Sequence, residues 1–216
     1  DSPAAAQLLA GPHFISVRYP HRNGEPYRVE IVPAANPNGA RLDTGLSCVK
    51  VHERSGTGIC LVPPTDSLGV TVQFFDRAFH VTRELVLAGT PSRARLSPGG
   101  RRGAVTNFLS GHSYEDTTFT TATTILDLRD GTSSNLESWT AFDGARQVTE
   151  KSRNFWGVTF TDDDTFYVSM GIRAERYLLR ADARTRTMQV IGTRMECPSV
   201  APDGRHLTFR RSVVES

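Results

Sequence analysis

A hairpin pattern that recurs along the chain constrains its fold more than any other feature. The clearest copy is PSVAPDGRHLTF (residues 198–209), in which Pro-Asp-Gly separates two short runs that alternate apolar and polar residues. Proline presets a negative φ, aspartate hydrogen-bonds its own backbone and glycine accepts a positive φ, so these residues favour a tight turn. Alternation on both sides of a turn is typical of strands. The stretch therefore predicts a β-hairpin.

Three further stretches repeat this plan. Residues 93–108 have Ser-Pro-Gly-Gly at the turn, residues 156–168 have three aspartates there, and residues 48–61 are a looser copy. Successive turns lie roughly 40 to 65 residues apart, which is the spacing of the four-stranded blades of a β-propeller. No segment shows helical periodicity over three turns. The sequence therefore predicts an all-β propeller of four-stranded antiparallel blades.

The blades can be placed along the chain after a flexible lead at residues 1–12. We expect them at residues 13–46, 47–88, 89–149, 150–194 and 195–216, the last one truncated, and we place the fourth strand of the third blade at residues 136–141. The chain ends directly after the second strand of a hairpin, where no domain should stop. We therefore expect an incomplete propeller, with about four to five blades of an expected six, which would be monomeric when complete.

Several of these stretches resemble one family. APDGRHLTF (residues 201–209) and LSPGGRR (96–102) are similar to the S-P-D-G-(R/K)-x-(L/I)-x-F hairpin of TolB-like β-propellers. Four further stretches resemble a secreted or membrane-anchored bacterial subgroup of this family. They are GTPSRARLSP (89–98), SGHSY (110–114), NFWGVTF (154–160) and ECPS (196–199). The resemblance covers residues 45–216, and Gly99 and residues 162–164 depart from the motif. It implies partner binding through a face of the propeller, outside the cytoplasm.

Candidate catalytic and metal-binding motifs are weak. GHSYE (residues 111–115) approaches the G-x-S-x-G nucleophile elbow, but Glu115 replaces the second glycine and β-type sequence follows where a helix is required. Ser113 therefore fits a polar loop better than a nucleophile. Asp162, Asp163 and Asp164 are the ligand type that Ca²⁺ prefers, yet they lack the spacing of a calcium loop and fit a solvated turn. We predict no catalytic residue, no metal and no cofactor.

The net charge and the hydropathy of the chain limit the classes of partner that fit it. The formal net charge of +2 is too small to indicate nucleic acid or an anionic membrane. No apolar run approaches the ~18 residues of a transmembrane helix, and this chain contains no signal segment. The aromatic-rich stretch from Trp139 to Tyr167 fits packing between blades better than stacking on sugar or nucleic acid, because its rings fall on alternating strand positions.

Cys48 and Cys60 flank the turn of the hairpin at residues 48–61. If that turn centres near Arg54, the two cysteines face each other on neighbouring strands, within disulfide reach. A pair of small buried hydrophobic side chains is the alternative. Cys197 has the equivalent place in its own hairpin, opposite Thr208, and we expect it to be a free thiol.

Two functions fit the sequence. One is a non-catalytic propeller that binds or scaffolds a protein or peptide partner in an extracytoplasmic location, either periplasmic, secreted or membrane-anchored. The other is the propeller domain of a prolyl-oligopeptidase-like serine peptidase whose catalytic domain lies outside this chain. Such propellers share the Pro-Asp-Gly hairpins, and a hydrolase motif elsewhere in the parent gene would distinguish the two.

Blade geometry suggests where a partner would bind. The Pro-Asp-Gly turns lie on one face of a propeller, whereas the loops at 111–118 and 171–176 and the starts of the inner strands gather on the other. The second face carries a denser mix of charged and aromatic side chains around the channel mouth, where binding sites concentrate. We expect a partner site formed by Arg93, His112, Tyr114, Asn154, Arg173 and Glu196. The alternative is that these residues pair with one another at a solvated rim.

Overall fold

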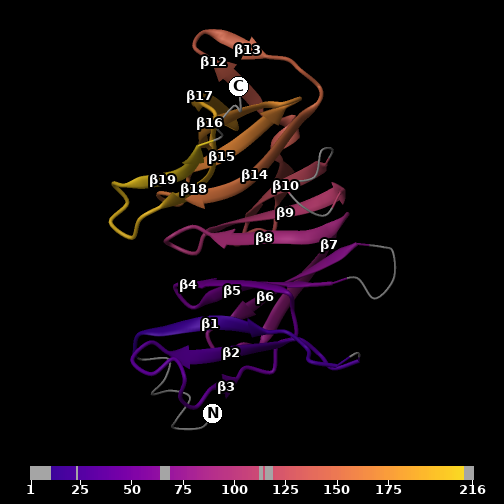
Figure 1. The fold of residues 1–216 in the computed structure, drawn as a ribbon, viewed down its shortest axis with the longest axis vertical. Coiled ribbons are helices and arrows are strands. Elements are labelled where there is room, and N and C mark those ends of the chain that lie inside the picture. Colours follow the sequence, from indigo (N-terminus) through magenta and orange to yellow (C-terminus); the bar gives the residue numbers. More distant parts are fainter. Residues whose placement is uncertain (1–10, 23, 64–68, 112–113, 115–118, 212–216) are drawn as a thin grey trace.

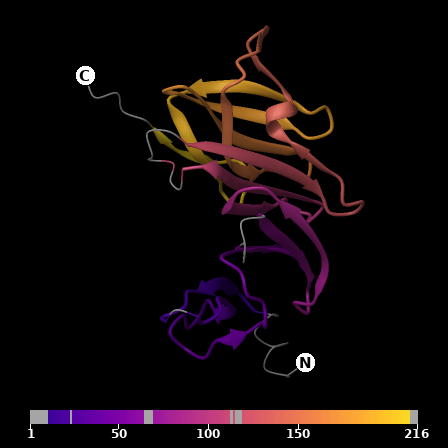
Figure 2. The ribbon, with the colours of Figure 1, turned by 90° about the vertical axis from the view of Figure 1, so that its right-hand side faces the viewer.

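The structure is a computed structural model that describes residues 11–22, 24–63, 69–111, 114 and 119–211. Across these residues it contains nineteen strands and one short 3₁₀ helix, η1 (Leu136–Ser138). The expected all-β class is therefore confirmed. Figure 1 shows the first four sheets stacked one upon another from the N-terminal end, with the last pair of strands beside the fourth sheet, and Figure 2 shows that the sheets follow one another along an arc.

Four of the five sheets in the described residues are built only from consecutive antiparallel strands. The first holds β1 (His13–Arg18), β2 (Arg28–Pro33) and β3 (Leu42–Asp43). The second holds β4 (Lys50–Arg54), β5 (Thr57–Val62), β6 (Val70–Asp76) and β7 (Val81–Leu87). The third holds β8 (Thr90–Leu96), β9 (Arg102–Ser110), β10 (Thr120–Asp127) and β11 (Ser133–Asn135).

The fourth sheet departs from this simple order. Its antiparallel part is β14 (Arg153–Phe160), β15 (Thr165–Ile172), β16 (Glu175–Asp182) and β17 (Thr187–Thr193), and the hairpin of β12 (Thr140–Asp143) and β13 (Arg146–Val148) extends it. The fifth sheet is the pair β18 (Met195–Val200) and β19 (Leu207–Arg211). The first strands of successive sheets lie side by side, β4 against β8, β8 against β14 and β14 against β18. These inner strands surround a common axis.

The core lies between the sheets. Ile59 and Leu61 of the second sheet pack with Ala94 and Val105 of the third, and a larger cluster joins the third sheet to the fourth. Cys60 lies between Ile59 and Leu61 in the sequence, and its side chain packs toward the first sheet instead. Because both faces of a middle sheet are covered, its second strand reads as a continuous apolar run.

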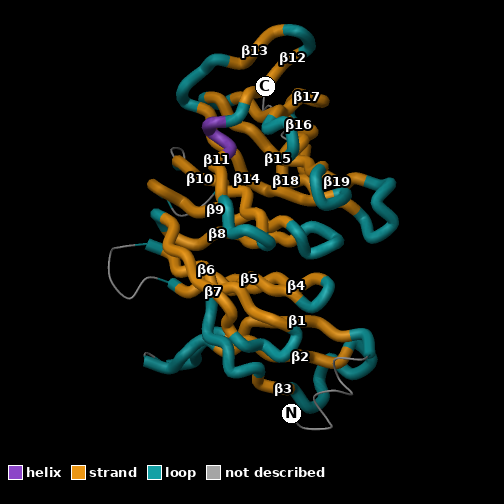
Figure 3. The backbone as a smooth tube through the Cα atoms, turned by 180° about the vertical axis from the view of Figure 1, so that it is seen from behind, coloured by secondary structure: helices purple, strands orange, loops and turns teal. Residues whose placement is uncertain are grey.

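One predicted strand was wrong. The sequence placed a fourth strand of the third unit at residues 136–141, whereas the structure forms η1 there and β12 pairs in parallel with β17 of the next sheet. The cause is local, because the Asn135 side chain accepts a hydrogen bond from the Glu137 N–H and caps η1. The chain turns away from β11 at this cap, and Figure 3 shows η1 as the only helical segment among the described residues.

The strand register of the hairpin at residues 48–61 also differs from the expectation. Ser55 and Gly56 both have positive φ, 53° and 76°, so the turn is a two-residue turn and Arg54 pairs with Thr57. Cys60 consequently faces Val51 rather than Cys48. The two cysteines nevertheless form a disulfide with their Cα atoms 5.6 Å apart, because Cys48 lies just before β4 and reaches Cys60 from there.

The last hairpin differs in the same way. Thr208 pairs with Ser199 rather than with Cys197, and a bulge lies between Glu196 and Ser199. Cys197 lies within this bulge at a φ of 53°. It is a free cysteine that is partly exposed.

Candidate functional site

The two ends of the axis carry different segments. We call the turns between inner and second strands the turn face, residues 55–56, 97–100, 161–164 and 201–204. These turns contact one another, since the Ser55 hydroxyl donates to the Pro98 carbonyl at 3.0 Å. We call the opposite end the loop face: Tyr114, the turn at residues 173–174 and the starts of β8, β14 and β18.

Aromatic side chains form a cluster on the loop face. The Tyr114 ring stacks on Trp156 with centroids 5.8 Å apart and planes 28° from parallel. Phe119 meets Trp156 edge-on at 5.3 Å, and Phe108 lies 4.8 Å from Tyr114. Cys197 packs against the same group. Strands from the third, fourth and fifth sheets therefore meet here.

The Tyr114 hydroxyl is fixed by a neighbour on β8. It shares a hydrogen bond of 2.6 Å with the Ser92 hydroxyl. Burial raises the pKa of Tyr114 above its ordinary value, while the bond to Ser92 and the nearby charge of Arg93 pull in the opposite direction. The phenol is therefore neutral at physiological pH and offers both a donor and an acceptor.

A buried carboxylate lies beside the aromatic cluster. Glu196 is only 3% exposed, and its oxygens lie 2.7 Å from Nη2 of Arg210 and 3.8 Å from Nε of Arg176. The Arg176 guanidinium lies in turn over the Trp156 ring, 5.5 Å from its centroid. A cation held over an indole and paired with a buried carboxylate is fixed in position.

Trp156 also carries an unsatisfied donor. The side chain is 1% exposed, and its Nε1–H has no hydrogen-bond partner within the described part of the chain. A buried donor without an acceptor destabilises the fold by the desolvation free energy of that group. The indole N–H is therefore a buried donor beside the aromatic cluster.

Three of the six residues expected at the partner site gather here. Arg93, Tyr114 and Glu196 lie at or next to the aromatic cluster. Asn154 is used internally, because its amide accepts from the Thr121 N–H and donates to the Phe119 carbonyl. Arg173 is exposed in the β15–β16 turn, where its carbonyl accepts from Arg176 at 3.0 Å. His112 lies outside the described residues, as does Ser113.

Sequence reasoning assigned Trp156 to packing between blades and missed its place beside Tyr114. The missed signal is a pair of bulges, one in β14 after Trp156 and one in β18 after Glu196. Gly157 and Cys197 take positive φ of 72° and 53° inside them. Bulges redirect side chains and are common next to functional sites. Both occur at equivalent places, at the start of an inner strand.

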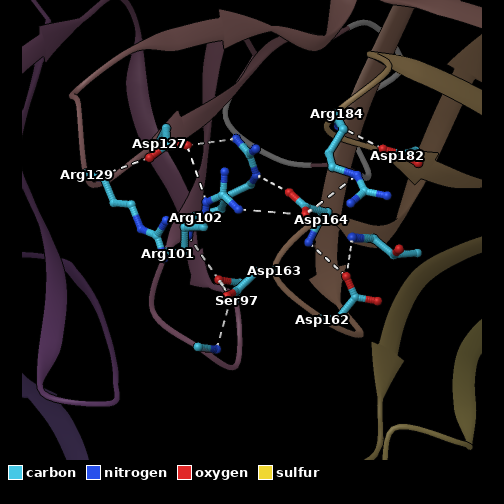
Figure 4. Close-up of polar contacts among 12 residues, drawn as sticks. Ser97, Arg101, Arg102, Asp127, Arg129, Asp162, Asp163, Asp164, Asp182 and Arg184 are labelled. Carbon is cyan, nitrogen blue, oxygen red and sulfur yellow. Dashed lines mark hydrogen bonds and ion pairs between the residues drawn. The ribbon is translucent and has the colours of Figure 1, made fainter.

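The three aspartates of the turn face do not converge on a common point. Asp162 accepts from the N–H groups of its own turn, at 2.8 and 2.7 Å. Asp163 accepts from the Ser97 hydroxyl at 2.6 Å, whereas Asp164 pairs with Arg102 at 3.0 Å (Figure 4). The described residues contain no group of three or more acidic, histidine or cysteine side chains arranged to hold a metal ion. We call Asp163, Asp164, Ser97 and Arg102 the clasp, because they join the third sheet to the fourth.

Comparison with known structures supports the propeller. TolB from Acinetobacter baumannii matches with a TM-score of 0.55 and 14% identity, over 93% of this chain and 47% of that one. The Cps50 (Swd1) β-propeller domain of Myceliophteria thermophila matches with a TM-score of 0.54 and 14% identity, over 93% and 67%. Oligopeptidase B from Leishmania major gives 0.50 and 10%, over 87% and 30%.

These identities establish the fold alone. The chain is a β-propeller domain that spans less than half of the length of TolB and about two thirds of the Swd1 domain. No family model matches the sequence, and no curated protein matches it. Across the described residues, no helix is long and apolar enough to cross a membrane.

Proposed function

We propose that this chain is a non-catalytic, TolB-like propeller module that binds or scaffolds a protein or peptide partner through its loop face. The observation that carries the proposal is the cluster of Tyr114, Trp156, Arg176 and Glu196 at the loop-face end of the axis. Tyrosine, tryptophan and arginine are the residue types that dominate the binding free energy of protein interfaces. They lie here on loops and strand starts that a rigid scaffold holds.

The chemistry of the cluster favours a peptide. The Tyr114 hydroxyl either donates or accepts, so it suits a backbone carbonyl or N–H. Arg93 adds a positive charge at the same end of the axis and suits an acidic side chain. A peptide presents both complementary groups within a few residues, which supports a peptide segment as the ligand.

The proposed site keeps the six residues expected from sequence and divides their roles. Arg93, Tyr114 and Glu196 form its centre, and Asn154 positions β10 against β14. Arg173 supports Arg176 through its carbonyl. His112 belongs to the proposal by sequence alone.

An extracytoplasmic location is part of the proposal. The disulfide between Cys48 and Cys60 supports it, because such bonds persist in oxidising compartments and are rare in the cytosol. The periplasm, the cell surface and the medium all meet this condition.

A capture experiment tests the proposed function. The full chain is immobilised, a partner is cross-linked from extract of the source cells, and the recovered protein is identified and its affinity measured. Tyr114→Ala and Arg93→Ala are expected to weaken binding about tenfold or more, the size of an interface hot spot. Tyr114→Phe keeps the ring and is expected to weaken binding less.

Arg205→Ala is the matched control on the turn face, because it removes a charge at the other end of the axis and should leave affinity unchanged. Loss of binding in Arg205→Ala with full binding in Tyr114→Ala would contradict the proposal. All variants are checked for a wild-type circular dichroism spectrum, so that misfolding is not read as lost binding.

The second candidate is a propeller domain of a peptidase. The likeness to oligopeptidase B favours it at the level of fold. A hydrolase motif in the parent gene, with labelling of the full gene product by a serine-reactive fluorophosphonate, would support this candidate and contradict a purely non-catalytic module.

A further inference from the structure

A pocket opens at the turn-face end of the axis. Its volume is about 550 Å³, within the range of small-molecule sites. The lining comes from the inner strands of four successive sheets, with His52 from β4, Arg95 from β8, Thr159 from β14 and Ser199 from β18. Arg54, Pro202 and Gly204 complete the rim.

The charged groups of this pocket have one sign. Arg54 and Arg95 line it, and no carboxylate does so among the described residues. Arg95 is half-buried, and its only hydrogen bond within the described chain is a long one of 3.4 Å to the neighbouring Ala94 carbonyl. Burial lowers the pKa of Arg95, and the nearby charge of Arg93 acts in the same direction. A partly desolvated guanidinium without a carboxylate partner destabilises the unliganded protein.

The uncharged lining groups offer donors as well. The Leu96 N–H donates to Nδ1 of His52 at 3.2 Å, and burial lowers the pKa of His52 to about 4. The ring is therefore neutral at physiological pH, and its proton lies on Nε2, which is a donor. Thr159 accepts from the Val200 N–H through its hydroxyl oxygen at 3.2 Å, so its hydroxyl hydrogen is available to a ligand.

We propose that this pocket binds a small organic anion, whose phosphate or carboxylate group pairs with the Arg95 guanidinium. The cavity is lined by two guanidiniums, an imidazole N–H and a threonine hydroxyl. This set of donors suits an oxyanion. The site lies at the opposite end of the axis from the proposed partner site. The proposal is therefore independent of the proposed function, and either can fail alone.

Calorimetric titration of the full chain tests this site with two probes, inorganic phosphate and citrate, against sodium chloride at matched ionic strength. Saturable binding of either probe is expected, and the two arms identify whether phosphate or carboxylate is preferred. Arg95→Gln is expected to weaken that binding about tenfold or more, as the loss of a charge-assisted hydrogen bond requires. Arg205→Ala, a charge removal on the same face outside the pocket lining, should change it less than about twofold.

A second variant tests the same pocket in case Arg95→Gln does not fold. Arg54→Gln changes an exposed side chain and is expected to weaken binding about threefold or more. Thermal unfolding gives an independent readout, because the preferred anion should raise the unfolding temperature of the wild type more than that of either variant. Absence of saturable binding in the wild type, or equal weakening by Arg205→Ala and the pocket variants, would overturn the proposal.

Discussion

At the scale of single residues, Glu137 has a carboxyl whose ionisation affects the stability of this molecule. Burial raises the pKa of its carboxyl to about 7. The N–H groups of Thr123 and Phe155 and the charge of Arg153 act in the opposite direction. These amides lie near enough to lower the pKa without completing a hydrogen bond to either carboxyl oxygen. Glu137 is therefore largely protonated in the folded state below neutral pH.

The raised pKa predicts a pH-dependent stability. The folded state binds the proton more tightly than the unfolded state, whose pKa is close to 4.5, so this stabilisation is complete below that value. It is lost as the pH rises to about 7 and above. Glu137→Gln should therefore raise the unfolding temperature at pH 8 by about 3 °C or more, with a smaller change at pH 5.

The control for this prediction is Glu175→Gln, which alters an exposed carboxylate. Thermal unfolding of the wild type and both variants from pH 5 to pH 8 measures the effect. An equal change in unfolding temperature at both ends of this range for Glu137→Gln would show that its carboxyl titrates normally.

At the scale of elements, the clasp explains two departures from the repeated hairpin motif. Asp163 accepts from the Ser97 hydroxyl and from the Gly99 N–H, at 2.6 and 3.0 Å. A Cβ on residue 99 would lie 2.4 Å from the Asp163 carboxylate, so the usual turn aspartate would displace this carboxylate from its hydrogen bonds. The turn of the third sheet therefore has no aspartate of its own, and its donor groups bond to Asp163 of the fourth sheet instead.

The clasp predicts a measurable coupling between sheets. Asp163→Ala leaves the Ser97 hydroxyl, which is fully buried, without its acceptor, and should lower the free energy of unfolding by about 1–3 kcal/mol. Asp163→Asn keeps an acceptor oxygen and should lower it less. A double-mutant cycle with Ser97→Ala, followed by urea denaturation, should show strongly non-additive changes. Additive changes would mean that this contact does not join the sheets.

The same elements show how far the sequence could predict the structure. The hairpins at residues 93–108 and 156–168 were predictable because turn chemistry and alternation are local properties. The register around Cys60 was not, because it depends on a two-residue turn at Ser55 and Gly56 that tolerates a positive φ at serine. Strand β12 was misplaced because its parallel pairing with β17 is a contact between residues 47 apart, Thr140 and Thr187, and no local pattern encodes it.

The candidate site was predictable only in part for a related reason. Arg93, Tyr114 and Glu196 followed from blade geometry, which places the starts of inner strands around one mouth. Trp156 lies there beside a bulge in β14, and it meets Arg176 from β16, a contact that the hairpin motif does not encode. The arginine pocket on the turn face depends on side chains from four sheets, and a single hairpin motif carries no information about such a set.

At the scale of the whole molecule, the inner strands place two different surfaces at the two ends of one axis. The loop face holds an aromatic cluster with a buried carboxylate, and the turn face holds a cationic pocket. A rigid stack of sheets separates them, so a partner at one end need not disturb the other. We propose that a protein or peptide partner contacts the loop face.

Hydrogen–deuterium exchange of the full chain, alone and with its captured partner, tests that claim most directly. Bound partner should slow exchange at residues 90–93 and 195–197, the starts of β8 and β18, and leave exchange at residues 201–205 on the turn face unchanged. Slower exchange confined to residues 201–205, with none at 195–197, would contradict the account.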